Sequence, residues 1–329
     1  DVLFAIDNGD IDFNDIDDMI AAEKLDPKMG EAYIKNHNPK YKYIEPIQEL
    51  KNREDLPEEL YNLDILDGSP PCSSFSMIGN RGADWGKEKK FREGQAEQVL
   101  DTLFFDFIEL AKKLKPKVVI AENVKGLLAG EAKKYVNNIL KAFDDAGYYV
   151  DFILLDASKM GVPQKRERVF FIAIRKDLYK GIFTDLFSTR PEIDLNFNEE
   201  EILFKDIKNE DERKPIQDKI KEAYQYCIDN QVSDFAKYFV KKESKRKYFS
   251  NRLIFKNRVC DTITANAYTH VIEGEAGYIN EREVKLVGSY PLDYDFINSK
   301  PEYLVGMSVP PVMTAQIATR ISEQWLSKI

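Results

Sequence analysis

Short apolar segments alternate with amphipathic ones along the first half of the chain, and this alternation restricts the fold more than any other feature. The apolar segments are typical of strands buried on both faces, and they cover residues 2–7, 63–68, 117–122, 148–157 and 168–175. Between them, residues 95–114 and 132–145 repeat apolar positions every three or four residues, as amphipathic helices do. The sequence therefore predicts an α/β fold with a doubly wound, mostly parallel sheet covered by helices.

The same pattern indicates how the chain divides into domains. Residues 1–176 carry the alternation and are expected to form one large domain. Residues 177–278 have mixed charge and weak periodicity, which favours a second, smaller domain. Residues 279–329 end in a clean helical pattern and are expected to return to the first domain.

Composition excludes several classes of protein. With 43% hydrophobic and 32% charged residues, the chain is not disordered, collagen-like or a coiled coil. No segment reaches the length that a membrane-spanning helix needs, and no signal core is visible. Three cysteines and two histidines are too few for a disulfide framework or a zinc site. We expect a cytoplasmic protein that binds neither metal nor membrane.

Charge is distributed unevenly along the chain. The net charge of −9, taken alone, argues against a nucleic-acid partner, because Lys and Arg drive phosphate binding. Residues 241–258, however, carry eight basic residues against one acidic residue, with aromatic residues between them. Such a run is often only a solvated face. The interleaved aromatic residues favour a surface that binds a nucleic-acid backbone.

Reactive side chains follow the predicted strands at positions where open α/β sheets bind ligands. Cys72 lies in a proline-rich loop just past one strand, and Glu122 ends the next strand. Gln164, Arg166 and Arg168 lie at the entry of a further strand, where a period of two puts both arginines on one side. Each has a commonplace alternative, namely a buried thiol, a salt-bridged carboxylate or a surface pair. Their order and spacing in one chain make the combination specific.

The chain resembles the cytosine-C5 DNA methyltransferase family of bacteria and their phages. The motifs that carry the resemblance occur in the family's order and extend over most of the sequence. They are SPPCSSFS at 69–76, IAENVKGLL at 120–128, QKRERVFFI at 164–172, REVKLVGSYPLDY at 282–294 and YLVGMSVPP at 303–311. The resemblance implies a Rossmann-like catalytic domain, with residues 177–278 as the target-recognition domain.

The activity implied by the resemblance is methyl transfer from S-adenosylmethionine to C5 of cytosine in duplex DNA, releasing S-adenosylhomocysteine. Cytosine C5 is a weak nucleophile, so a group must first add to C6, and Cys72 is the implied nucleophile. Glu122 would donate a proton or hydrogen bond to N3 and would have to hold that proton at neutral pH. Arg168 would hold the cytosine O2, with Arg166 assisting. The target base must leave the stacked duplex to be reached.

The resemblance also implies contacts with the cofactor and with DNA. Cofactor contacts are expected from Asp7, with Asp26 as a rival, and from Pro70, Leu103 and Ser308. DNA contacts are expected from Ser76, Arg81, Gln164, Lys245, Arg246, Lys247 and Thr264. The expected assembly is a monomer on duplex DNA.

The sequence departs from the family at its start. The Phe-x-Gly-x-Gly turn that normally begins the fold does not occur, and the sequence opens where the family's second strand would lie. This predicts that the central position of the sheet would be empty. We expect a strand, glycine turn and helix that are absent from this sequence or supplied by another chain. An inactive DNA-binding or partner subunit and an RNA cytosine-C5 methyltransferase remain as alternatives.

Overall fold

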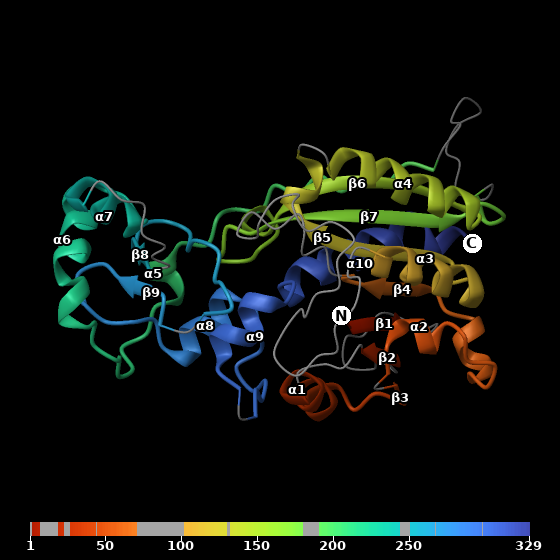
Figure 1. Ribbon diagram of the computed structural model, residues 1–329, viewed down its shortest axis with the longest axis horizontal. Helices are drawn as coiled ribbons and strands as arrows, with labels where there is room; N and C mark the ends of the chain where they lie inside the picture. The colour runs from red at the N-terminus through yellow and green to blue at the C-terminus, as the bar shows by residue number, and fades with distance from the viewer. Residues whose placement is uncertain are drawn as a thin grey trace. The chain divides into compact units, whose positions relative to one another are not determined.

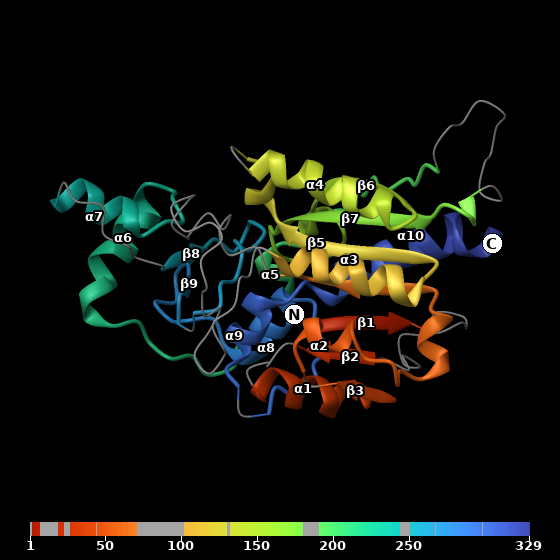
Figure 2. The ribbon, with the colours of Figure 1, turned by 45° about the vertical axis from the view of Figure 1, so that its right-hand side comes forward.

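The computed structural model describes most of the chain, and Figures 1 and 2 show it from two directions. The described residues are 2–6, 19–22, 27–43, 45–70, 102–129, 132–179, 191–243, 251–266, 268–297 and 299–329. They fall into two compact units. The first unit contains residues 1–155, 167–195 and 318–329, and the second contains residues 156–166 and 196–317.

The first unit is built on a seven-stranded sheet with the order β3-β2-β1-β4-β5-β7-β6. Its strands are β1 (Val2–Ile6), β2 (Met19–Ala22), β3 (Tyr41–Tyr43), β4 (Ile65–Gly68), β5 (Val118–Val124), β6 (Tyr148–Asp156) and β7 (Glu167–Arg175). Its helices are α1 (Pro27–His37), α2 (Ile47–Leu50), η1 (Glu58–Tyr61), α3 (Leu103–Leu114), η4 (Lys125–Leu128), α4 (Ala132–Asp145) and η8 (Leu326–Lys328). Helix α10 (Pro311–Gln324) begins in the second unit and ends in the first.

Aromatic side chains join the helices α3 and α4 to one face of this sheet. Phe104 of α3 lies edge-on to Phe143 of α4 and to Phe171 of β7, with ring centroids 6.5 and 5.3 Å apart. All three rings are buried, and each such burial is worth about 1.5–3 kcal/mol. Apolar residues of β5 and β7 that point to the opposite face, such as Ile120 and Ile172, are buried as well. The central strands are therefore covered on both faces, as their continuous apolar sequences predict.

The α/β fold class is confirmed, and the sheet mixes strand directions. β2 pairs with β3, and β4 with β5, in parallel. β7 runs antiparallel to β5, which corrects the expectation of a mostly parallel sheet for this strand. The reason lies in the connection from β6 to β7, which contains only the short helix η5 (Ala157–Lys159), whereas a parallel crossover needs a dozen or more residues.

The position beside β4, expected to be empty, is occupied by β1. This strand lies between β2 and β4 (Figure 1) and runs antiparallel to both. Leu3 lies opposite Gly68, and Ile6 lies opposite Ile65. Because β1 pairs with β4, the backbone donors and acceptors on that edge of β4 have hydrogen-bond partners. The expectation of a vacant central position is therefore corrected.

Several predicted element boundaries are confirmed by the structure. Helix α3 ends at Leu114, and Lys115 then adopts a φ of 53° directly before Pro116. The predicted start of this helix, from residue 95, lies outside the described residues. Helix α4 spans the predicted 132–145, and Gly147 turns the chain with a φ of 93°, which glycine adopts without strain.

The second unit combines short helices with a small parallel sheet. Its strands are β8 (Arg252–Ile254) and β9 (His270–Ile272), and its remaining helices are α5 (Phe204–Ile207), η7 (Asp218–Ile220), α6 (Lys221–Asp229), α7 (Ala236–Glu243), α8 (Glu281–Val287) and α9 (Pro301–Met307). A core of its own joins α6 to the sheet through buried residues that include Tyr224, Cys227, Leu253 and Val271. This unit therefore has the core that an independent domain needs.

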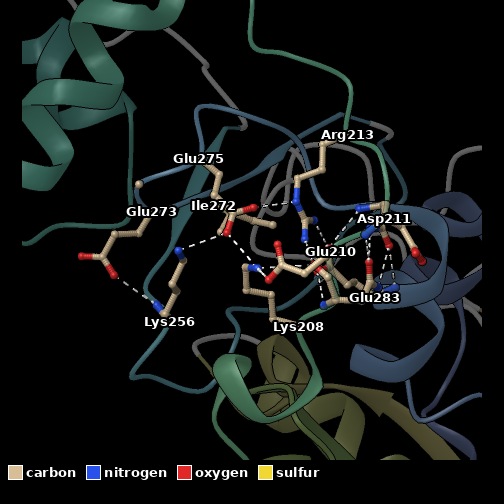
Figure 3. A network of polar contacts seen from close by, with 12 residues as sticks. Lys208, Glu210, Asp211, Arg213, Lys256, Ile272, Glu273, Glu275 and Glu283 are labelled. Carbon is tan, nitrogen blue, oxygen red and sulfur yellow. Dashed lines mark hydrogen bonds and ion pairs between the residues drawn. The ribbon is translucent and has the colours of Figure 1, made fainter.

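An ionic network joins four segments of the second unit (Figure 3). Arg213 binds both carboxylate oxygens of Glu283 on α8, and its Nε lies 2.6 Å from Glu275 Oε2. Lys208 and Lys256 also pair with Glu275, at 3.1 and 3.0 Å. Glu283 is fully buried and also caps the N-terminus of α8, since its carboxylate accepts the Asn280 backbone N–H. The network therefore fixes the start of α8 in this unit.

Candidate active site

Glu122 and Arg168 form an ion pair at the end of strand β5. Strands β5 and β7 place Val124 opposite Arg168 and Glu122 opposite Phe170, so that both charged side chains lie on the same face of the sheet. The Arg168 Nε lies 2.8 Å from Glu122 Oε1, and the two side chains are only 17% and 12% exposed. The Arg168 Nη1 also donates to the Glu167 carbonyl at 2.9 Å. Two residues expected in the catalytic site thus contact each other directly.

Asn123 connects the end of β5 to the segment that precedes Cys72. Its side-chain amide donates to the Pro70 carbonyl at 3.0 Å, and its Oδ1 accepts the Val124 backbone N–H at 2.9 Å. Asn123 is buried. This bond brings the chain two residues before Cys72 next to Glu122. Sequence reasoning did not assign Asn123 a role, although it forms the centre of the ENV motif.

Cys72 itself lies outside the described residues, as do Ser76, Arg81, Asp7, Asp26, Lys245, Arg246 and Lys247. The two cysteines that are described, Cys227 and Cys260, are both buried. Burial raises the pKa of Cys227 to about 12 and also raises the pKa of Cys260. Since the thiolate is the reactive form, neither is suited to act as a nucleophile at neutral pH. Cys72 therefore stays the candidate.

Asp67 is a second carboxyl group near Glu122. In β4 it lies opposite Ile120 of β5, two residues before Glu122. Burial and the charge of Glu122 raise the pKa of Asp67 to about 7, although a hydrogen bond from the Gly68 backbone N–H acts in the opposite direction. The strand end therefore holds two acidic groups and one guanidinium among the described residues. Asp67 was not singled out from the sequence.

Gln164 and Arg166 are buried in the second unit, where their side chains bind its backbone. The Gln164 amide donates to the Val287 carbonyl at 3.1 Å and its Oε1 accepts the Ile263 N–H at 3.1 Å. The Arg166 guanidinium, 1% exposed, donates to the carbonyls of Ile263 and Gly306 at 3.1 and 3.0 Å. Both residues were expected to contact DNA or the base. In the structure, the Gln164 and Arg166 side chains instead hold the backbone of the segments that contain Ile263 and Gly306.

Thr264 and Ser308 lie beside these bonds. The Thr264 hydroxyl is buried and has no hydrogen-bond partner among the described residues, whereas the Ser308 hydroxyl donates to the Val305 carbonyl at 3.2 Å. Leu103, expected at the cofactor, starts α3 and is buried in the apolar core of the first unit. Pro70 is buried, and its carbonyl is occupied by Asn123. The roles of these four residues toward a cofactor or DNA stay predictions.

Gly306 touches the backbone beside Thr264, which leads to a prediction. A Cβ at this position would lie 2.3 Å from the Thr264 carbonyl carbon and 2.4 Å from the Ala265 nitrogen, and neither atom can move away freely. We expect Gly306→Ala to destabilise the second unit by about 1–3 kcal/mol, the usual cost of overpacking, despite the higher helix propensity of alanine. Thermal unfolding of the purified variant measures this. An unchanged midpoint would contradict it.

Membrane-spanning helices and metal-binding clusters are both absent from the described residues. None of the helices that the structure describes is both long and apolar enough to span a bilayer. The described residues also contain no group of three or more His, Cys, Asp or Glu arranged to bind a metal ion.

Known proteins are similar to this chain in sequence and in fold. A family profile described as C-5 cytosine-specific DNA methylase matches residues 3–323. The Type II methyltransferases M.FnuDI of Fusobacterium nucleatum and M.NgoPII of Neisseria gonorrhoeae are 38% and 41% identical over 162 and 160 residues. These alignments cover 49% and 48% of this chain and 42% of each relative, so the chain matches less than half of their length.

A solved structure supports the fold assignment alone. A mutant of DNMT2 from Spodoptera frugiperda is similar with a TM-score of 0.56 and 18% sequence identity. The alignment covers 91% of this chain and 90% of that chain. The similarity therefore extends through both compact units.

Proposed function

We propose, because this chain belongs to the C-5 cytosine-specific DNA methylase family, that it transfers a methyl group to C5 of cytosine in duplex DNA. The observation that carries the proposal is the Glu122–Arg168 pair at the end of β5, next to the Asn123–Pro70 bond. Together they supply a carboxyl group and a guanidinium beside the segment that leads to Cys72. A nucleophile, a proton donor and a fixed cation are the groups that this chemistry needs.

The reaction begins with the thiolate of Cys72, whose sulfur bonds to cytosine C6. The electron pair of the C5–C6 double bond moves into the ring, and the Glu122 carboxyl gives its proton to N3, which neutralises the developing charge. Arg168, held by Glu122, is available to donate to O2 of the base. After C5 is methylated, its proton passes to a water molecule, and the electrons of that C–H bond rebuild the double bond as the Cys72 sulfur leaves. The proton on N3 then returns to Glu122.

S-adenosylmethionine is the proposed methyl donor, and it would supply a methyl group on a positively charged sulfonium. The described end of the sheet can favour this positive charge whenever Asp67 or Glu122 is ionised, because a carboxylate attracts a nearby cation. By resemblance, Pro70, Leu103 and Ser308 would contact this cofactor, and Asp7 or Asp26 would bind its ribose.

Methyl transfer from labelled S-adenosylmethionine to duplex DNA tests the function directly. The full-length protein is expected to methylate cytosine C5, and DNA with 5-fluorocytosine at the target is expected to trap it as a denaturant-resistant adduct, because fluorine cannot leave as a proton does. Transfer to RNA alone would favour the RNA methyltransferase. DNA binding without transfer would favour the inactive subunit. Either result would overturn the proposal.

The basic run is proposed to bind the DNA backbone as part of the recognition segment 177–278. We expect replacing Lys245, Arg246 and Lys247 with glutamine to weaken DNA binding and to flatten its salt dependence. The log-log slope should fall by about 0.9 for each phosphate that the variant no longer neutralises. Lys133, Lys134 and Lys141, three exposed lysines on α4, offer a matched triple control. Equal slopes in both triple variants would instead indicate a solvated face.

A further inference from the structure

An exposed tyrosine of the second unit has two lysine side chains over its ring. Tyr268 lies shortly before strand β9 and is 42% exposed. The Lys214 Nζ lies 4.0 Å from the centroid of its ring, and the Lys300 Nζ lies 5.4 Å from it. Lys214 comes from the segment before η7, and Lys300 directly precedes α9. The fold therefore brings three distant parts of the chain together at one exposed ring.

The two lysines have no acidic partner. Both side chains are exposed, and within the described part of the chain neither forms an ion pair with a carboxylate. Arg213, next to Lys214, is by contrast paired with Glu275 and Glu283. Since both ammonium groups lie close to one ring centroid, they are within about a Debye length of each other, about 10 Å at 0.1 M salt, and repel. Their positive charge is therefore available to an anion.

The backbone at Tyr268 is strained. Its φ of 56° lies in the left-handed region, which bulky L residues rarely adopt. The surrounding structure holds this conformation, because the Asn251 side-chain amide donates to the Tyr268 carbonyl at 3.3 Å and the Tyr278 ring lies 5.7 Å away between centroids. The Tyr278 backbone N–H in turn donates to the Lys214 carbonyl at 2.9 Å. Strain of this kind is concentrated at sites that bind ligands.

The strained tyrosine lies beside the basic run of residues 241–258. Asn251, which donates to the Tyr268 carbonyl, belongs to that run. The next residue, Arg252, donates its backbone N–H to the Thr269 carbonyl at 2.7 Å. Lys214 and Lys300 thus add positive charge next to a segment that is already proposed to bind the DNA backbone. This continuity favours a nucleic-acid phosphate over a small free anion as the ligand.

We propose that Lys214, Tyr268 and Lys300 form a second binding site for the phosphate backbone of duplex DNA, beside the basic run. The inference rests on the proposed function, which makes duplex DNA the ligand. The two ammonium groups donate to phosphate oxygens, and the Tyr268 ring holds both cations in place while its hydroxyl is a further donor. Cations interleaved with aromatic rings are typical of surfaces that follow a nucleic-acid backbone.

The salt dependence of binding to a fluorescently labelled DNA duplex tests the two lysines. The double variant Lys214→Gln with Lys300→Gln should lower the log-log slope by about 0.9 for each lysine and weaken binding about tenfold or more at 0.1 M salt. Lys205→Gln with Lys219→Gln is the matched control. These two lysines are also exposed, belong to the same unit and form no ion pair among the described residues. The control should keep the wild-type slope.

The variant Tyr268→Asn tests the ring separately from the charge. Asparagine adopts a left-handed φ more readily than tyrosine, so the midpoint of thermal unfolding should not fall. DNA binding should weaken about fivefold, because the ring no longer holds the two ammonium groups, while the salt slope stays unchanged because no charge is removed. A merely structural tyrosine would instead lower the midpoint and leave binding intact.

Several results would overturn the inference. Equal slopes of the wild type and the Lys214 and Lys300 double variant would do so, and so would an equal loss of slope in both double variants, which would reflect net charge alone. Weaker binding to an RNA hairpin with unchanged binding to the DNA duplex would assign the lysines to RNA and also overturn it. Wild-type DNA affinity of Tyr268→Asn would exclude the tyrosine from the site.

Failure of the proposed function gives a different result from failure of this inference, because DNA binding is measured without methyl transfer. If the wild type transfers no methyl group but only the Lys214 and Lys300 double variant loses slope, the proposed function fails and the binding site stands. If the wild type methylates duplex DNA and the slopes are equal, the inference fails alone.

Discussion

Replacing Cys72 with serine is expected to abolish methyl transfer while DNA binding stays largely unchanged. A serine hydroxyl is far less ionised than a thiol at neutral pH, so the bond to C6 does not form and C5 is not activated. The binding surface proposed for the DNA backbone involves other residues. Transfer of labelled methyl groups and a DNA-binding titration on the same preparation measure the two effects separately.

A second cysteine provides the control for this variant. Cys227 lies in the core of the second unit, and burial raises its pKa to about 12. Cys227→Ser is therefore expected to keep turnover and to lose only stability. Only the Cys72 variant should fail to form the adduct with 5-fluorocytosine. Normal methylation by Cys72→Ser would refute the covalent mechanism, because neither Cys227 nor Cys260 is suited to replace Cys72 as the nucleophile.

The sequence predicts the central part of the first unit well. β5 and β7 are continuous apolar segments, and α3 and α4 repeat apolar positions with helical periodicity. Both patterns match what a sheet covered by helices requires. Strand direction is less predictable, because it depends on which strands become neighbours. The antiparallel pairing of β1 and of β7 comes from tertiary placement and from the short connection before β7, and neither is a property of the strand's own residues.

In the candidate site too, features set by a local motif could be predicted, whereas contacts between residues far apart in the chain could not. Glu122 and Arg168 were expected together from their motifs, and the pair forms at 2.8 Å. The burial of Arg166 could not be foreseen, because it depends on carbonyls of Ile263 and Gly306, 97 and 140 residues away in the chain. Asp67 was missed for a related reason. Its position near Glu122 depends on the register of β4 against β5, which the sequence alone does not determine.

Arg213→Met is expected to cause the largest loss of stability in the second unit. The substitution leaves the carboxylate of Glu283, which is 0% exposed, without its cation. Removing one partner of a buried pair typically costs about 3–5 kcal/mol, because an uncompensated charge stays in the interior. The Glu283 side chain would still accept the backbone N–H groups of Asn209 and Asn280, which places the expected loss toward the lower end.

Hydrogen exchange of α8 (Glu281–Val287) is the suitable measurement, since the chain has two compact units and global unfolding need not be two-state. The double variant Arg213→Met with Glu283→Gln removes both charges and should regain part of the lost protection, because the buried charge is gone and the glutamine oxygen can still accept one of the two backbone donors. Lys221→Met breaks an exposed pair with Asp218 and should change little. If the single and double variants were equally destabilised, the loss would come from packing of the arginine side chain and not from the buried charge of Glu283.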